Sequence, residues 1–379
     1  MTKKVIVIGA GVAGLASAIR LQHAGYQVEI HEKDATPGGK MNRIEKDGYQ
    51  FDLGPSIVMM PELYREIFEL CGRDPDDYIP MEKLDPMYRV YFSDTPDTPI
   101  DISSDLTELT RMIESISPGD TEGFLNYMHD IYKGYIFARD NILGRPFHKR
   151  SDFYNLSMLR KAPKVKLVGT ADNFIGRYIN SERLKQIMGF QTLYIGVSPF
   201  TGPSFYSMIP MIQFLYGIWF IKGGMYTMAT AMERLFEELG GEIFYGSAVQ
   251  EISIDAGRAT GIKVDDRKID AEYVVCNADF PYAMKNLVKS PRAKGKFTDR
   301  KIDGMKYSCS AFLLYLGMDR KYDDVEHIHN FIFNESLEKN MKDIFEGKKL
   351  DHASFYVYIA SKLDPTLAPE GKDGLYILM

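Results

Sequence analysis

Residues 1–40 carry the pattern that most constrains what this chain can fold into. A short β-branched apolar run at residues 5–8 leads directly into three glycines, Gly9, Gly11 and Gly14. Residues that favour a helix fill the interval before a second apolar stretch begins at Val28. A buried parallel strand, a tight turn, a helix and another strand in this order predict the first βαβ unit of an α/β domain.

The three glycines have separable roles that point to a dinucleotide. Gly9 allows the tight turn, Gly11 allows the backbone to approach a pyrophosphate, and Gly14 allows the helix to pack on the strand. The negative phosphates would meet the free N–H groups at the helix start, where Val12 and Ala13 stand. The pattern therefore predicts a phosphate-binding turn.

An acidic residue stands where the second strand should end. Glu32 follows the glycines at the distance at which a carboxylate can accept both hydroxyls of an adenosine ribose, and Lys33 comes next. A lone glycine motif is weak evidence, but here strand, glycines, helix, second strand and acid all follow in order. We therefore prefer a nucleotide site to a purely structural turn.

A second glycine motif favours FAD over NAD. Gly38, Gly39 and Lys40 follow Glu32 closely, and Gly54-Pro55 comes soon after. The doublet resembles the second signature of the FAD-dependent amine oxidase and carotenoid desaturase superfamily, in which this loop passes close to the cofactor phosphates. The alternative is a Pro-Gly turn with a solvated lysine.

Composition excludes several classes of protein. The chain has 379 residues, a hydrophobic content of 45% and a net charge of −6, which favours a globular protein and argues against nucleic acid as a partner. Its three cysteines, Cys71, Cys276 and Cys309, match no metal spacing and indicate a reducing, cytosolic compartment. No signal peptide precedes the first predicted strand.

Two neighbouring segments have compositions that are typical of contact with a membrane. Residues 186–221 contain no Asp, Glu, Lys, Arg or His, but Pro210 and Gly217 interrupt any spanning helix. The segment is ordinary core, the wall of an apolar cavity or a patch in one leaflet, and we favour the last two together. A basic cluster precedes it, either a solvated face or a surface for anionic headgroups: Arg145, His148, Lys149, Arg150, Arg160, Lys161, Lys164 and Lys166.

All these motifs, with residues 220–225 and 277–279, together resemble the bacterial carotenoid desaturases. Residues 190–196 and 207–212 resemble the dehydrosqualene (4,4′-diapophytoene) desaturase branch of that family. The resemblance covers essentially the whole chain. It implies an FAD enzyme on the cytoplasmic face of the cell membrane that desaturates a long apolar polyene precursor, 4,4′-diapophytoene, to 4,4′-diaponeurosporene.

The resemblance also implies a cofactor site, in which the backbone of Val249 contacts the adenine. It assigns no catalytic acid or base, and Arg139, Asp140 and Arg145 are weak candidates. The implied cofactor-binding residues are Gly9, Gly11, Val12, Ala13, Gly14, Glu32, Lys33, Gly38, Gly39, Lys40, Gly54, Pro55 and Val249.

The expected architecture is a Rossmann-like FAD-binding domain interleaved with a mixed α+β substrate domain. We expect residues 1–70 and 222–290 in the first domain and residues 71–221 and 291–379 in the second, with a buried strand at 273–279. Family members usually carry a further C-terminal segment that closes over the flavin, so we expect this chain to be a fragment or a truncated reading frame.

Two alternatives stay open on the same fold. One is an amine oxidase, which would need a polar entrance and an aromatic cage. The other is a non-enzymatic isoprenoid carrier, similar to the GDP-dissociation inhibitors. The sequence indicates no oligomeric state.

Overall fold

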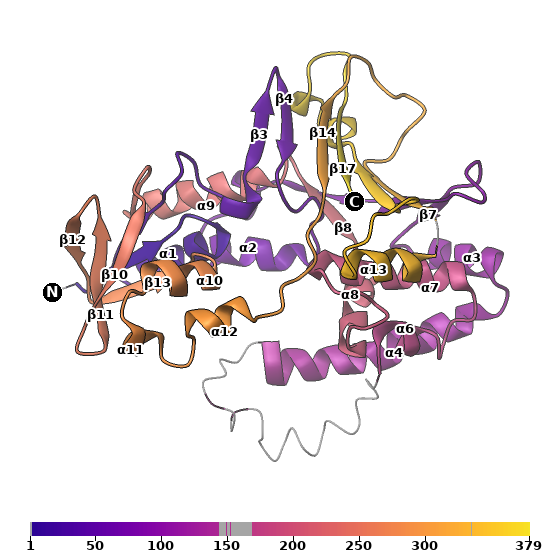
Figure 1. The fold of residues 1–379 in the computed structure, drawn as a ribbon. Coiled ribbons are helices and arrows are strands. Elements are labelled where there is room, and N and C mark those ends of the chain that lie inside the picture. Colours follow the sequence, from indigo (N-terminus) through magenta and orange to yellow (C-terminus); the bar gives the residue numbers. More distant parts are fainter. Residues whose placement is uncertain (1, 144–148, 150–151, 153–168, 335) are drawn as a thin grey trace.

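In the computed structural model, four parallel strands form the sheet that the opening residues begin (Figure 1). In hydrogen-bonded order they are β13 (Tyr273–Cys276), β1 (Lys4–Ile8), β2 (Gln27–His31) and β9 (Glu242–Phe244). Helix α1 (Val12–His23) follows β1, and α9 (Tyr226–Glu238) packs against it. The structure describes residues 2–143, 149, 152, 169–334 and 336–379.

Position in this sheet determines which strands are buried. Strand β1 has a neighbour on both sides, and Val5 and Val7 are buried. Strand β13 is the sheet edge, and Tyr273 and Cys276 are exposed. The predicted strand is present at Tyr273–Cys276 and ends before the polar residues 277–279, but the prediction that it is buried is wrong, because an edge strand has a hydrogen-bonded neighbour on one side only.

A small antiparallel sheet lies beside the parallel one (Figure 1). Its strands are β10 (Val249–Asp255), β11 (Arg258–Val264) and β12 (Arg267–Asp270). Ile252 and Ile262 pack with Ile6 and Ile8 of β1 in one hydrophobic cluster. Three short helices come next along the chain: α10 (Phe280–Tyr282), α11 (Pro291–Lys294) and α12 (Asp299–Asp303).

A six-stranded sheet forms the second large layer and joins segments that are far apart in the chain. Its pairs are antiparallel except for β15 and β6, which run parallel. The order is β14 (Leu313–Gly317), β17 (Gly374–Leu378), β16 (Phe355–Tyr358), β15 (His329–Phe333), β6 (Tyr88–Phe92) and β7 (Ile100–Ile102). Residues 88–102 thus lie beside residues 313–378.

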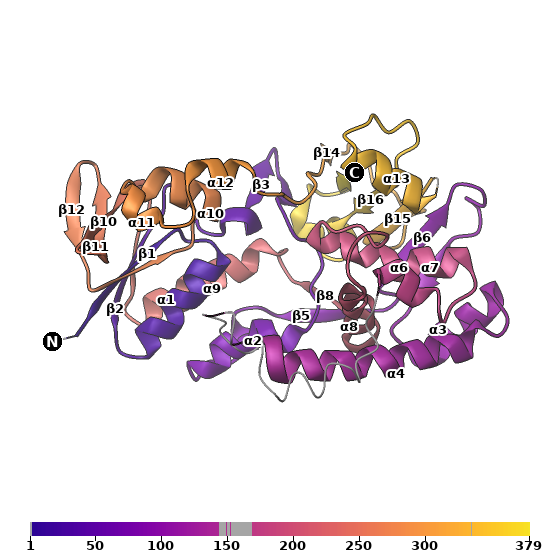
Figure 2. The same ribbon diagram turned by 60° about the horizontal axis from the view of Figure 1, so that its bottom comes forward.

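Helices gather around this sheet, at the end of the molecule away from the N-terminus (Figure 2). Their apolar faces and the sheet form the largest hydrophobic cluster, which includes Tyr88, Phe124 and Phe331. These helices are α3 (Leu106–Ile116), α4 (Asp120–Ala138), α6 (Ala171–Ile175), α7 (Glu182–Gly189), α8 (Met208–Tyr216) and α13 (Leu337–Phe345).

Two ribbons and one helix lie between the two large layers. The ribbons are β3 (Arg43–Lys46) with β4 (Tyr49–Asp52), and β5 (Met81–Leu84) with β8 (Ile218–Ile221). The helix is α2 (Pro61–Leu70). We keep the division into 1–70 plus 222–290 and 71–221 plus 291–379 as a proposal.

The charge-free segment 186–221 begins in the last turn of α7, continues through two 3-10 helices, Phe190–Ile195 and Ser204–Ser207, and ends in α8 and β8. Gly217 ends α8 with a φ of +77°, which L side chains rarely adopt. Met211 and Gln213 are buried, whereas Leu215 is exposed. Among the described residues, no helix is long and apolar enough to cross a membrane. Of the basic cluster, only Lys149 lies within the described residues.

The buried carboxylate of Asp120 anchors α4 to the turn before α7. It accepts hydrogen bonds from the amide and side chain of Asn180 at 2.8–3.1 Å and from the Ser181 amide at 2.9 Å. Burial opposes the charge, but these N–H groups hold the pKa of Asp120 below its ordinary value. The carboxylate is thus ionised at neutral pH and accepts these hydrogen bonds in its charged form.

Replacing Asp120 with alanine is expected to lower the free energy of unfolding by about 3 kcal/mol, because buried N–H donors of a charge-assisted network lose their acceptor. Urea unfolding followed by circular dichroism measures the loss. Glu122→Ala, at an exposed position of the same first turn, is the control and should change stability by less than about 0.5 kcal/mol. Equal midpoints for the two variants would contradict this role.

Candidate cofactor site

The first glycine motif lies at the carboxyl end of β1, where α1 begins. Gly9 has a φ of +96°, and Gly11 stands at the N-cap of α1 without a side-chain cap. The first turn, with Val12 and Ala13, carries no acidic residue. Its free N–H groups and the helix dipole therefore favour an anion at this point.

The second glycine motif packs directly on the first. The Gly38 amide donates to the Ala10 carbonyl at 3.0 Å. A Cβ at Gly39 would lie 3.3 Å from Cα of Gly11, so the two loops are in van der Waals contact. The structure therefore brings together two motifs that the sequence places about two dozen residues apart.

Side chains at these glycines would meet fixed neighbours. A Cβ at Gly14 would lie 2.1 Å from the Gly9 carbonyl oxygen, so the helix can pack this closely only through glycine. A Cβ at Gly11 would lie 2.9 Å from Nδ2 of Asn277, which follows β13. Asn277 therefore lies beside the predicted phosphate-binding turn, although it is not among the residues predicted for the site; residues 277–279 are one of the motifs that carry the family resemblance. A signal for it was therefore available.

Glu32 is held at the end of β2 with its carboxylate turned to the glycine turn. Its Oε2 accepts the Ala10 amide at 2.7 Å, and Oε1 accepts the Asp34 amide at 2.9 Å. The Ser247 amide donates to the Glu32 carbonyl at 2.7 Å, which brings the chain just before Val249 to the same place. The predicted ribose and adenine positions thus lie side by side.

Of the remaining predicted cofactor-binding residues, one packs against the glycine motifs and the others are exposed to solvent. Gly54 is close to the second glycine motif, because a Cβ there would lie 2.2 Å from the Lys40 carbonyl oxygen. The side chains of Lys33 and Lys40 point to solvent, and they lie 2.7 Å from Asp34 and 3.9 Å from Asp279 respectively. Pro55 is exposed.

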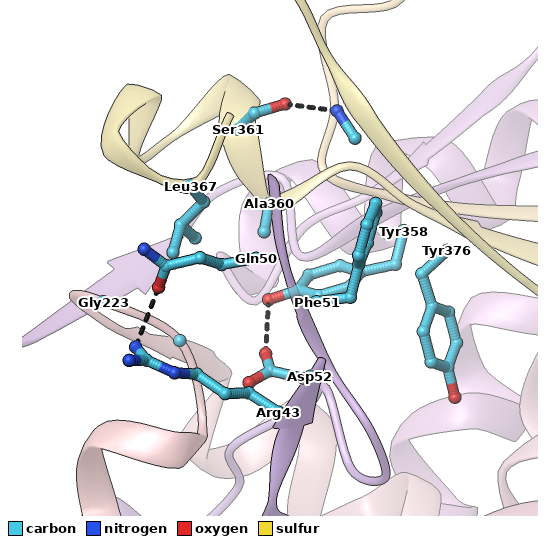
Figure 3. A pocket seen from close by; sticks show the side chains of 12 residues that line it. Arg43, Gln50, Phe51, Asp52, Gly223, Tyr358, Ala360, Ser361, Leu367 and Tyr376 are labelled. Atoms are coloured by element: carbon cyan, nitrogen blue, oxygen red, sulfur yellow. Dashed lines mark hydrogen bonds between the residues drawn. The ribbon is translucent and has the colours of Figure 1, made fainter. Parts of the chain in front are cut away.

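A pocket opens where β4, the turn after β8 and the C-terminal strands meet (Figure 3). The empty space at this pocket, which includes open solvent, is about 400 Å³. In Figure 3, the Arg43 guanidinium donates a hydrogen bond to the Gln50 side chain, and the Tyr358 hydroxyl points to Asp52. The lining residues are Arg43, Gln50, Phe51, Asp52, Gly223, Gly224, Tyr358, Ala360, Ser361, Leu367, Gly374 and Tyr376.

Asp52 joins β4 to the start of α9 in the wall of this pocket. Its Oδ1 accepts the Tyr226 amide at 3.3 Å, and the Tyr358 hydroxyl lies 3.5 Å from Oδ2. Burial raises the pKa of Asp52 to about 6, against the opposing effect of the Met225 and Tyr226 amides. A Cβ at Gly224 would lie 2.9 Å from the carboxylate, which explains the glycine.

These residues fit the pyrophosphate and ribose of a dinucleotide. The cradle of Gly11, Gly14 and Gly39 leaves no room for side chains where a pyrophosphate would approach, and Glu32 stands at the ribose end. Gly54 links the phosphate end to the pocket, because its carbonyl accepts the hydroxyl of Tyr376 at 3.3 Å.

Residues 12–373 match the family of flavin containing amine oxidoreductases. The chain belongs to this family. The prediction of an FAD-dependent oxidoreductase is therefore confirmed, as are FAD as the cofactor and the resemblance to the carotenoid desaturases. The individual cofactor contacts stay a proposal.

Curated members of the family are close in sequence. The 4,4′-diapophytoene desaturases (4,4′-diaponeurosporene-forming) of Staphylococcus aureus strains bovine RF122 / ET3-1 and Newman are each 45% identical over 380 residues. The alignments cover 99% of this chain and 75% of each relative.

Solved structures share the fold. An oxidoreductase from Methanosarcina mazei matches with a TM-score of 0.65 and 20% identity over 99% of this chain and 78% of its own. Putrescine oxidase bound to putrescine matches with a TM-score of 0.61 and 12% identity over 100% of this chain and 76% of its own. The predicted α/β architecture with a Rossmann-like FAD-binding part is confirmed by these likenesses.

A Rab GDI from Plasmodium falciparum also matches, with a TM-score of 0.58 and 12% identity over 100% of this chain and 82% of its own. At this identity the likeness establishes the fold alone. The fold by itself therefore does not establish a function.

Proposed function

We propose that this chain desaturates 4,4′-diapophytoene to 4,4′-diaponeurosporene with bound FAD. The observation that carries the proposal is 45% identity to desaturases of that name over 99% of the chain. The glycine cradle and Glu32 support it, because they provide what an FAD-dependent enzyme needs at the nucleotide end.

When bound, FAD supplies the redox chemistry by accepting a hydride from the substrate. In this proposal the turn at Gly9, Gly11 and Gly14 and the start of α1, with Val12 and Ala13, hold the pyrophosphate. The doublet Gly38-Gly39 and Lys40 add to this phosphate site. Glu32, flanked by Lys33, binds the ribose, and the backbone of Val249 contacts the adenine. Gly54 and Pro55 lie toward the ring.

The substrate is a hydrocarbon without a polar group, so its binding must come from apolar contacts. We propose that the Met- and aromatic-rich interior near residues 186–221 provides the wall of that site. We propose further that this part of the chain meets the inner face of the cell membrane, from which such a substrate would be drawn.

The first measurement is the visible spectrum of the purified chain after FAD is supplied and the excess removed. We expect retained flavin bands, followed by conversion of 4,4′-diapophytoene in liposomes to a product with the longer conjugation of 4,4′-diaponeurosporene. Flavin retention with oxidation of amines but not of the polyene would favour an amine oxidase instead. Colourless protein that still binds the polyene would favour a carrier.

A further inference from the structure

Three side chains from distant parts of the sequence form a continuous hydrogen-bonded chain. Nδ1 of His329 on β15 lies 2.6 Å from the hydroxyl of Tyr356 on β16. The same hydroxyl lies 2.9 Å from Oγ of Ser56, which directly follows Gly54-Pro55. The chain thus connects the six-stranded sheet to the loop proposed to lie near the flavin ring.

The inner end of this chain is a buried imidazole with one nitrogen unused. His329 is 1% exposed, and its Nε2 has no hydrogen-bond partner among the described residues. Burial lowers the pKa of His329 to about 3, so the ring is neutral. With the proton on Nδ1, which then donates to Tyr356, Nε2 presents a free lone pair.

The outer end reaches toward solvent, whereas the surroundings of the inner end are apolar and aromatic. Ser56 is half-buried. The His329 ring stacks on Tyr358 at 5.1 Å, and Tyr358 also lines the pocket beside Asp52. Burial also raises the pKa of Tyr356, so its hydroxyl keeps its proton and can pass it on.

Desaturation creates a need for such a chain. Two C–H bonds of the substrate break for each new double bond. One hydrogen leaves as a hydride with its electron pair, and the electron pair of the other bond becomes the new π bond. The second hydrogen must then leave as a proton from a water-poor, apolar site, which needs an acceptor.

We propose that Ser56, Tyr356 and His329 carry this proton out of the substrate site, an inference that rests on the proposed function. Nε2 of His329 takes the proton while Nδ1 releases its own to Tyr356. Tyr356 passes its hydroxyl proton to Ser56, which releases one to solvent. One proton enters at the inner end and one leaves at the outer end, so the chain is unchanged in charge after the transfer.

The test uses the FAD-loaded chain with 4,4′-diapophytoene in liposomes and follows anaerobic bleaching of the flavin in H2O and D2O. Tyr356→Phe and Ser56→Ala should slow bleaching by about 100-fold, the usual scale of a lost proton transfer, while flavin content stays unchanged. Ser56→Thr restores the hydroxyl and should restore the rate. Wild type should show a solvent isotope effect.

A matched control separates proton transfer from packing. Tyr88→Phe removes another buried hydroxyl, on the neighbouring strand β6, whose partners are the side chains of Gln191 and Gln213 and not a member of the proposed chain. It should leave the bleaching rate and the isotope effect as in wild type. Equal rates in wild type, Tyr356→Phe and Ser56→Ala would overturn the relay but not the desaturase, whereas no bleaching in wild type would overturn both.

A second readout needs neither FAD nor substrate. In the chain labelled with 15N-histidine, the Nδ1 resonance of His329 should shift in Tyr356→Phe, because its hydrogen bond is lost, and stay in place in Tyr88→Phe. His329→Phe identifies the resonance. An unchanged Nδ1 signal in Tyr356→Phe would contradict the hydrogen-bonded chain itself.

Discussion

Replacing Gly11 with valine is expected to leave a folded chain that retains much less FAD. The new side chain would lie where the backbone must approach the pyrophosphate, 2.9 Å from Nδ2 of Asn277. The Asn277 side chain can move aside, so we expect the fold to survive. The valine side chain would still occupy the space that the pyrophosphate needs. Overpacking in a rigid site costs about 1–3 kcal/mol, so we expect FAD affinity to fall by up to about 100-fold.

Flavin absorbance after gel filtration, together with circular dichroism, measures this effect. Gly304→Ala is the control, because its Cβ would lie 3.6 Å from the nearest atom, an ordinary contact. Gly14→Ala should behave differently and destabilise the fold, since its Cβ would lie 2.1 Å from a backbone oxygen. Full flavin retention by Gly11→Val would exclude this turn as the phosphate site.

The second large effect is expected at Asp52, whose replacement with asparagine should stabilise the chain above neutral pH. The pKa of Asp52 is raised from 3.8 to about 6, so the folded chain binds the proton more tightly than the unfolded chain. The contribution of this carboxyl group to the free energy of unfolding is fully present below the pKa of the unfolded chain. It is lost as the pH rises through about 6. The shift corresponds to about 3 kcal/mol.

Asparagine avoids this loss because it keeps an oxygen acceptor for the Tyr226 amide without a charge to bury. Urea unfolding without FAD, at intervals from pH 5 to 8, should give a gain of about 1–3 kcal/mol at pH 8 that shrinks toward pH 5. Asp105→Asn, an exposed cap of α3 that asparagine also fills, should follow the wild-type pH profile. A constant difference between Asp52→Asn and wild type would refute ionisation as the cause.

Local features were predictable because they depend on neighbours in the chain. The apolar run before Gly9 forms β1, since a short continuous run of β-branched residues is typical of a buried parallel strand. Tyr88, Val90 and Phe92 alternate with less apolar positions at the period of a strand, and β6 forms there. The capping residue Asp105 likewise marks the start of α3, because its carboxylate accepts the first free amides of that helix.

Features that depend on long-range pairing were not predictable from one sequence. The edge position of β13 follows from its pairing with β1, which no local pattern reveals. Ser56, Tyr356 and His329 meet only because β15 and β16 pair and then pack near the loop after β4. In the sequence, Asp52 lies just before Gly54-Pro55 and nothing local predicts that it is buried. It is buried because α9 and Tyr358, which are far away in the chain, pack against it.

The pairing of β1 with both β2 and β13 has a consequence for synthesis in the cell. Ile8 pairs with Cys276, so the sheet that carries the glycine turn is incomplete until most of the chain has left the ribosome. At roughly 5–20 residues per second, this delay lasts on the order of 15–50 s. Throughout that time, the apolar β1 has one open edge and is a target for chaperones. Cofactor loading should therefore be a late event in biogenesis.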